Sequence, residues 1–95
     1  MRGIIQRDKE CFLCRTLLNG HNPYGLEEHH IFKGRNRQKS EQYGLKVWLC
    51  HEHHRRLHGM HGHELDLYLQ KIGQMKFEES ESREEFRREF GKSYL

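Results

Sequence analysis

Two pairs of potential metal ligands stand far apart in the chain with the same internal spacing. Cys11 and Cys14 are separated by two residues, and so are Cys50 and His53. Brought together, the two pairs supply three thiolates and one imidazole, which form the closed tetrahedral shell that structural zinc prefers. Chance spacing is the alternative interpretation, but ligand spacing in both pairs makes it the weaker one. The sequence therefore predicts a structural Zn²⁺ site at Cys11, Cys14, Cys50 and His53.

The remaining histidines contain a second, open set. His54 and His58 are four residues apart, so a helix would place them on one face, and His29 comes from a segment far upstream. Three protein ligands leave room for water and phosphate. The neighbouring His30 is not needed as a ligand, and its neutral imidazole can accept a proton at roughly pH 7. The alternatives are a helix face that merely carries histidines and, for His30, one more exposed histidine.

Around these residues the chain resembles the HNH endonucleases, whose ββα-metal motif, or His-Me finger, wraps two strands and a helix around one catalytic cation. The resemblance lies in two segments, Leu26-Glu27-Glu28-His29-His30-Ile31 and Trp48-Leu49-Cys50-His51-Glu52-His53-His54-Arg55-Arg56-Leu57-His58. The His-x-x-x-His ending is similar to the colicin-type nucleases. The two cysteine-containing pairs are similar to those of small zinc-stapled HNH proteins of phages and bacteria. The resemblance covers roughly residues 11–58.

The resemblance implies a metal-dependent DNA endonuclease that hydrolyses phosphodiester bonds. His29, His54 and His58 would hold one catalytic divalent cation, either Mg²⁺, Mn²⁺, Ni²⁺ or Zn²⁺, and His30 would be the general base that activates water. The products would carry 5'-phosphate and 3'-hydroxyl ends. One cation and one base cut one strand per encounter, so a monomer would nick DNA and a homodimer could cut both strands.

One position departs from the family pattern. The middle Asn of the family, which holds the base histidine in place, would fall at Leu45, whose side chain has no hydrogen-bonding group. Asn36, Ser40 or a backbone carbonyl near Gly44 could replace it, because one acceptor is enough to fix the tautomer of a histidine. Of these we favour Asn36 as the residue that orients His30.

Basic residues cluster near the candidate site in the sequence. The formal net charge of +3 indicates little beyond solubility. A charge run by itself is more often a solvated polar loop, whereas one beside a metal site favours contacts to phosphate. The predicted DNA-binding residues are Lys33, Arg35, Arg37 and Lys39, which follow the His-His pair, and Arg55 and Arg56 on the expected metal helix.

Length and composition limit the class of protein. A chain of 95 residues with 34% hydrophobic residues has a marginal apolar core, and such domains commonly add a metal or disulfides. Its three cysteines cannot all pair with one another. Residues 1–4 form no apolar leader, and no apolar run approaches the roughly 18 residues of a membrane span. We therefore expect a soluble, reduced protein with no membrane partner, located in the cytoplasm, or in the host cytoplasm if it is phage-encoded.

The patterning of the chain predicts one α+β domain over residues 1–95 with a small ββα-metal core. The core, at about 26–58, would contain two strands and then a metal helix that ends at Gly59. The strands are expected at residues 26–32 and 45–49, with a basic loop at 34–40 between them and the metal helix at 50–58.

Two further helices are expected to pack on this core. The first, at about 64–79, has apolar residues at helical spacing, although Gly73 should weaken it. The second, at about 83–90, is indicated by a capping box at Ser82 and Glu85 and by a stop at Gly91. Its Phe86 and Phe90 share one face, which favours a place in the core over a base-stacking surface.

Two functions of other classes remain open at this point. A non-catalytic zinc module that binds nucleic acid would keep the Cys3His shell, and the missing middle Asn favours it. An accessory interaction protein, such as a phage packaging partner, would use its C-terminal helices to dock, which exposed aromatics at Phe86, Phe90 and Tyr94 would favour. A C2H2 reader finger is less favoured, because Cys14 and His54 lie much farther apart than the roughly twelve residues in such fingers.

Overall fold

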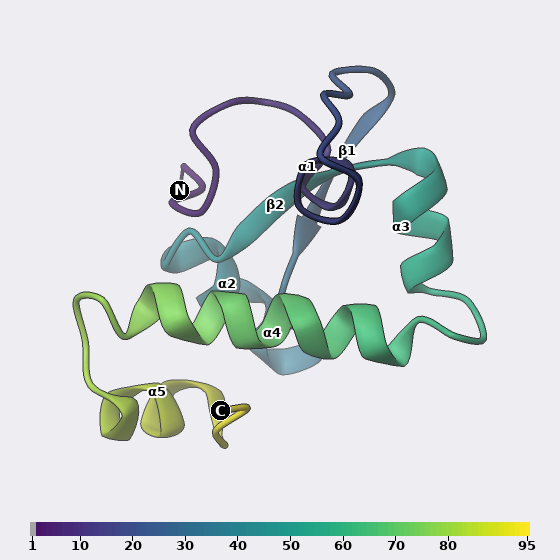
Figure 1. The fold of residues 1–95 in the computed structure, drawn as a ribbon. Helices are drawn as coiled ribbons and strands as arrows, with labels where there is room; N and C mark the ends of the chain where they lie inside the picture. The colour runs from purple at the N-terminus through teal and green to yellow at the C-terminus, as the bar shows by residue number, and fades with distance from the viewer. Residues whose placement is uncertain (1) are drawn as a thin grey trace.

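Two antiparallel strands lie at the centre of the computed structural model, which describes residues 2–95 (Figure 1). Strand β1 (Leu26–His30) pairs with β2 (Lys46–Cys50), so the two expected strands are confirmed within two residues at their ends. The expectations on residues 1–4 and on the 1–95 domain include Met1, which lies outside the described residues.

The register of the two strands decides which side chains share a face. Glu28 is paired with Trp48, and His30 is paired with Lys46. Successive side chains point to opposite faces of a strand, so these four residues lie on one face of the sheet. His29 is paired with Val47 and lies on the other face. The adjacent histidines of β1 are therefore directed to different sides of the sheet.

Helix α1 (Phe12–Leu18) lies where the sequence indicated only a metal-ligand pair. The Cys11 Sγ accepts a hydrogen bond from the Cys14 backbone N–H at 3.4 Å, which caps the helix at its beginning. Asn19, with φ of 52°, ends it in the left-handed conformation. Leu13 is fully buried and holds this short helix against the rest of the molecule.

The expectation of a basic loop at residues 34–40 is wrong. Gly34–Asn36 forms a 3-10 turn, η1, and it continues into helix α2 (Arg37–Gln42). The cause is a buried hydroxyl: Ser40 Oγ accepts from the Phe32 backbone N–H at 3.2 Å and donates to the Leu45 carbonyl. The helix is thereby fastened to the ends of both strands, a contact that local sequence does not encode.

Three helices follow β2. Helix α3 (His51–Leu57) begins directly after the strand, α4 is the long helix His63–Phe77 that crosses the front of Figure 1, and α5 (Arg83–Phe90) lies below it. The expected capping is confirmed, because Ser82 Oγ accepts from the Glu85 N–H at 3.0 Å and Gly91 ends α5 with φ of 95°. Among residues 2–95 no helix is long and apolar enough to cross a membrane.

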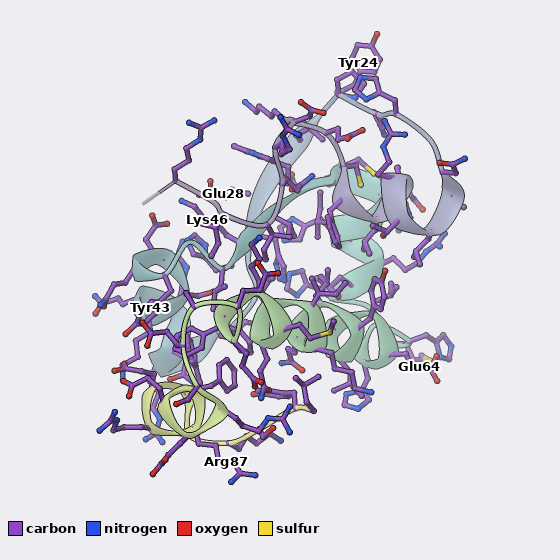
Figure 2. The ribbon with its side chains drawn as sticks, turned by 60° about the vertical axis from the view of Figure 1, so that its left-hand side comes forward. Tyr24, Glu28, Tyr43, Lys46, Glu64 and Arg87 are labelled. Carbon is purple, nitrogen blue, oxygen red and sulfur yellow. The ribbon has the colours of Figure 1, made fainter. Side chains whose placement is uncertain are left out.

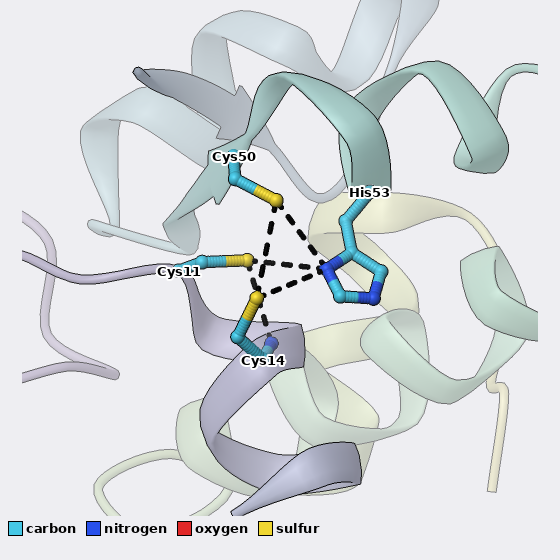
Figure 3. A group of neighbouring side chains, drawn as sticks. All are labelled: Cys11, Cys14, Cys50 and His53. Atoms are coloured by element: carbon cyan, nitrogen blue, oxygen red, sulfur yellow. Dashed lines mark hydrogen bonds between the residues drawn. The ribbon is translucent and has the colours of Figure 1, made fainter. Parts of the chain in front are cut away.

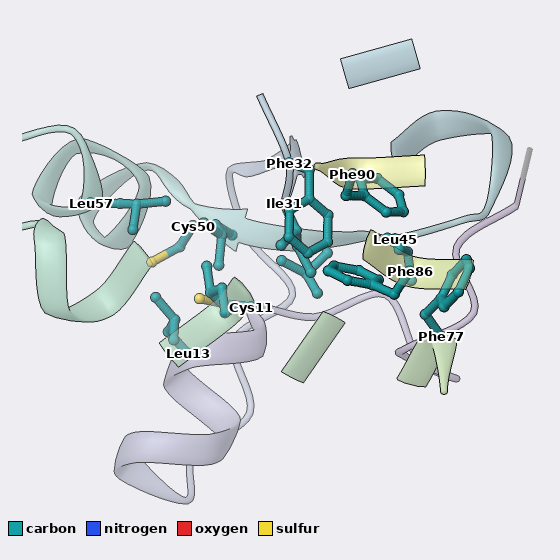
Figure 4. Close-up of a cluster of buried hydrophobic side chains, with 13 residues drawn as sticks. Cys11, Leu13, Ile31, Phe32, Leu45, Cys50, Leu57, Phe77, Phe86 and Phe90 are labelled. Carbon is teal, nitrogen blue, oxygen red and sulfur yellow. The ribbon is translucent and has the colours of Figure 1, made fainter. Parts of the chain in front are cut away.

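The core has an aliphatic and cysteine-containing end and an aromatic end (Figure 4). Phe86 and Phe90 are buried and contact Phe32, with ring centroids 5.4 and 4.7 Å away, which confirms their expected place in the core. Gly73 has a packing role in α4. A Cβ at this position would lie 3.1 Å from Phe32 Cε2. The missing side chain lets α4 pack closely on the segment that follows β1.

Candidate metal centres

The four predicted zinc ligands come together from two places in the fold. Cys11 and Cys14 stand at the beginning of α1, whereas Cys50 and His53 stand where β2 passes into α3 (Figure 3). The Nδ1 of His53 lies 3.5, 3.4 and 3.5 Å from the sulfurs of Cys11, Cys14 and Cys50, and the sulfurs of Cys14 and Cys50 are 3.9 Å apart.

These distances match the shell that zinc requires. A tetrahedron with zinc–sulfur bonds of about 2.3 Å and a zinc–nitrogen bond of about 2.0 Å has edges of about 3.8 Å between sulfurs and about 3.5 Å from sulfur to nitrogen. The group is also largely buried, with Cys11, Cys50 and His53 below a tenth exposed. Cys11, Cys14, Cys50 and His53 therefore form a site able to hold a metal such as zinc.

The loop before β1 is closed over this group. The Asn22 carbonyl accepts from the Cys11 N–H at 2.9 Å, and the Asn22 side chain donates to Cys14 Sγ at 3.6 Å. Burial acts to raise the pKa of the Cys11 thiol, but hydrogen bonds from the backbone N–H groups of Cys50 and Cys14 outweigh it, and the pKa falls below its usual range. At Cys11 the surroundings thus favour a thiolate, the form that binds metal, whereas burial raises the pKa of the Cys14 thiol to about 11.

The three histidines of the open set also converge. The ligand atoms of His29, His54 and His58 lie within 4.8 Å of one another, although β1 supplies the first and α3 and its C-terminal end supply the others. His29 Nε2 is buried and has no hydrogen-bond partner among residues 2–95. An unpaired buried nitrogen is costly, and a bound cation would satisfy it.

Electrostatics favour neutral rings, the form in which imidazole binds metal. Burial, together with the positive charge of the nearby Lys33, lowers the pKa of His29 to about 3. The pKa of His58 is lowered by the same two causes. His54 donates from Nδ1 to Glu27 at 2.6 Å, which leaves its Nε2 as the nitrogen with the available lone pair.

These histidines line an open hollow of about 240 Å³, which we call the histidine hollow. Two basic side chains, Lys33 and Arg37, also line it. Neutral nitrogen donors together with cations suit an anionic ligand such as phosphate. The full lining is Glu28, His29, His30, Lys33, Arg37, His54 and His58.

His30 is held by a carboxylate that the sequence did not indicate. Its Nε2 lies 2.7 Å from Glu41 Oε1, and the ring is only 9% exposed. The Nζ of Lys46 lies 2.9 Å from both oxygens of Glu41 and 3.4 Å from Glu28. Glu28, His30 and Glu41 also lie close enough together to hold a metal ion. The Lys46 ammonium, however, already neutralises the two carboxylates of this group.

The Glu41 contact corrects the expectation that Asn36 orients His30. The Asn36 amide instead donates to the backbone carbonyl of Phe90 at 3.0 Å, which ties η1 to α5. Ser40 is the other candidate side chain, and its hydroxyl hydrogen-bonds to the backbone of Phe32 and Leu45. Glu41 could have been found only by recognising α2, because the helix carries its carboxylate back to β1.

The predicted DNA-binding cations separate into two groups. Lys33 and Arg37 line the histidine hollow, and Lys33 also pairs with Asp66 at 3.3 Å. The other four lie elsewhere. Lys39 binds the carboxylate and carbonyl of Glu89, and Arg35 lines a separate hollow beside α5. Arg55 and Arg56 lie 2.9 and 4.0 Å from Glu52 on the exposed side of α3. The structure therefore brings only the first two to the histidines.

Comparison of the chain with protein-family models, with curated proteins and with solved structures gave no match. A functional interpretation of this molecule therefore rests on its own residues and their geometry. The geometry offers two candidate centres of different character. One is closed and rich in sulfur, and the other is open, lined by imidazoles and cations.

Proposed function

We propose that this chain is a metal-dependent DNA endonuclease of the HNH type, which hydrolyses phosphodiester bonds. One observation carries the proposal: His29, His54 and His58 converge in an open hollow whose wall also includes His30, a histidine held by a carboxylate. The order β1, β2, α3 is that expected of a ββα-metal core. The resemblance in residues 26–31 and 48–58 agrees with this interpretation.

The two centres would have separate roles. Cys11, Cys14, Cys50 and His53 would hold structural zinc, because four protein ligands leave no position for a substrate. His29, His54 and His58 would hold an exchangeable divalent cation, since three ligands leave positions open. Such a cation supplies stabilisation of the negative charge that develops on the phosphate and on the departing 3'-oxygen.

The proton transfer would belong to His30. Because Nε2–H of His30 donates to Glu41, the lone pair is on Nδ1, which accepts a proton from the attacking water. The water oxygen bonds to phosphorus, the bond from phosphorus to the 3'-oxygen breaks, and solvent protonates the 3'-oxygen. Lys33 and Arg37 bind nonbridging oxygens of the phosphate. The products carry 5'-phosphate and 3'-hydroxyl ends.

The accessory-protein alternative loses its principal support. Phe86 and Phe90 are buried, and Tyr94 is partly buried against the same core, so these aromatics do not offer a docking surface. The alternative of a non-catalytic zinc module rested on the missing middle Asn. Glu41 provides His30 with the hydrogen-bond acceptor that this Asn would provide, which favours the enzyme.

A plasmid assay tests the proposed function. Zinc-loaded protein is incubated with supercoiled plasmid and Mg²⁺, Mn²⁺, Ni²⁺ or additional Zn²⁺, and conversion to open circle is measured. The proposal expects nicking with at least one added cation and its loss in His54→Ala. An exposed histidine outside the site, His63→Ala, is the matched control. Binding of DNA without cleavage under any of these conditions would favour the zinc module instead.

A further inference from the structure

A second hollow, of about 330 Å³, lies between the N-terminal segment and the β1–β2 face that carries Trp48. Segment 2–9 is fastened there: the Ile4 N–H donates to the Gly44 carbonyl at 3.0 Å, and Gln6 Oε1 accepts from the Trp48 N–H at 2.7 Å. We call this the tryptophan hollow. It is a formed feature of the fold, because hydrogen bonds hold the segment to the end of α2 and to β2.

The charge of the tryptophan hollow is positive where it is exposed. Arg2, Arg7 and Lys9 line it and make no ion pair with another residue in the range 2–95. Its other cation, Lys46, is engaged by Glu41 and Glu28. Asp8 is the remaining acidic group in the wall. Three cations without carboxylate partners form a site for an anion, most simply a phosphate.

An aromatic ring lies among these cations. The Lys9 ammonium lies 4.4 Å from the centroid of the Trp48 ring, and Trp48 is partly exposed. Aromatic rings combined with backbone-neutralising cations are the means by which proteins bind unpaired nucleotides, since every base has a face that can stack. The Lys9 side chain is long and flexible, so it can leave the ring for a phosphate when a base takes its place.

The tryptophan hollow and the histidine hollow share one lining residue. Glu28 lines both, and it is paired across the sheet with Trp48. Figure 2 shows Glu28 and Lys46 beside each other on the side of the sheet reached by the N-terminal segment. His30 lies on the same face of the sheet as Trp48, so a polynucleotide with its phosphate beside His30 would have its neighbouring nucleotide at Trp48. The Glu28 carboxylate between them repels phosphate and favours a sugar or base at that point.

We propose that the tryptophan hollow binds an unpaired nucleotide next to the scissile phosphate, with its base on Trp48 and its phosphate on Arg7 and Lys9. The volume of about 330 Å³ is at the lower end of ligand pockets, roughly 300–1,000 Å³, and fits one nucleotide. A base in this hollow cannot remain stacked in a duplex, so the substrate class is DNA with a single-stranded or unpaired position at the cut. This inference depends on the proposed nuclease function in one respect only, which is that the bound nucleotide lies next to the cut.

The single tryptophan of the chain reports on this hollow. Zinc-loaded protein without any other divalent cation is titrated with a short oligothymidylate, and tryptophan fluorescence is followed. We expect saturable quenching, and affinity about tenfold lower in Arg7→Gln/Lys9→Gln, because neutralised phosphates and stacking dominate such binding. Trp48→Leu, followed by anisotropy of a labelled oligothymidylate, should show a comparable loss. Arg87→Gln on α5, distant from the hollow in Figure 2, should bind as wild type does.

Two further measurements, with a blunt duplex and with inorganic phosphate, identify the kind of ligand that the hollow binds. A blunt duplex should compete more weakly than the oligothymidylate, and inorganic phosphate should not quench. Equal competition by the duplex, or wild-type affinity in Arg7→Gln/Lys9→Gln, would overturn the proposal. The two proposals fail separately: quenching without nicking would contradict the nuclease alone, and nicking without quenching would contradict the nucleotide site alone.

Discussion

At the scale of single residues, His30 and Glu41 form the contact on which the proposed chemistry depends most. Lys46 holds the carboxylate of Glu41, and Glu41 holds the Nε2 of His30, so the orientation of the ring is fixed from β2 through α2. A histidine oriented in this way presents its other nitrogen in one direction without reorganisation. Glu41 would thus be a positioning residue for His30 in its proposed role as the base.

Removal of Glu41 should therefore lower the turnover rate more than it alters DNA affinity. We expect kcat to fall about 10- to 100-fold in Glu41→Ala, the usual effect of losing such an outer partner, with little change in KM. Glu41→Gln keeps a carbonyl acceptor and should recover part of the loss. Steady-state nicking kinetics measure both constants, and Glu52→Ala on the exposed side of α3 is the control. An unchanged kcat in Glu41→Ala would remove Glu41 from this role.

His54 should be separable from the structural site, because the two ligand sets share no residue. His54→Ala removes one of three donors from the histidine hollow and none from the Cys3His group. We expect much weaker binding of Mn²⁺ or Ni²⁺ and unchanged zinc content. Calorimetric titration of the zinc-loaded protein and its metal analysis provide the readouts. Wild-type affinity for the second metal in this variant would exclude His54 as a ligand.

At the scale of elements, the turn between α3 and α4 positions the histidine at the C-terminal end of α3. Gly62 lies against the Leu57 carbonyl, and a Cβ at Gly62 would run into that oxygen. His58 stands between them in the sequence, at the C-cap of α3. The approach of the two helices therefore requires a glycine, and it also helps to place a candidate metal ligand.

Gly62→Ala should destabilise the fold, because backbone atoms must shift to accommodate the new methyl group. We expect a loss of about 1–3 kcal/mol in the free energy of unfolding, typical of overpacking. Gly20→Ala is the matched control, since the nearest atom to its Cβ would be 3.8 Å away. Urea denaturation of both variants measures the difference. Equal stability of Gly62→Ala and wild type would contradict the close approach.

Elements with strong local patterns could be predicted from the sequence, and those that depend on distant contacts could not. The capping box at Ser82 and Glu85 placed α5 at its observed bounds, because both signals are local. Helix α2 was missed, since the hydroxyl of Ser40 fastens it to backbone groups of other segments. The convergence of Cys11, Cys14, Cys50 and His53 could be predicted from spacing alone. Glu41 was not, because its place beside His30 follows from α2.

At the scale of the whole molecule, the Cys3His group joins segments that the sheet alone does not connect. It links the beginning of α1 to the junction of β2 and α3, next to the aliphatic end of the core (Figure 4). A chain of 95 residues buries little apolar surface, so zinc at this group would contribute a large share of its stability. The separate aromatic end of the core does not replace that link.

Cys50→Ser should therefore release zinc and unfold the domain. Metal-binding free energy in such a site is largely folding free energy, and a serine hydroxyl is a poor zinc ligand. Circular dichroism and metal content of the purified variant are the measurements. Ser80→Ala, at an exposed position in the turn after α4, provides a control for general effects of substitution. A folded Cys50→Ser protein without bound zinc would show that the group does not support the fold.

If His30 is the base of the proposed nuclease, its removal in His30→Ala should abolish most of the nicking activity while the protein stays intact. Zinc content, affinity for the second metal and DNA affinity are measured on the same preparation, because all three should match wild type. Supercoiled-plasmid nicking should then fall about 10²- to 10⁴-fold, the contribution of a positioned general base. Nicking by His30→Ala at the wild-type rate would contradict the account.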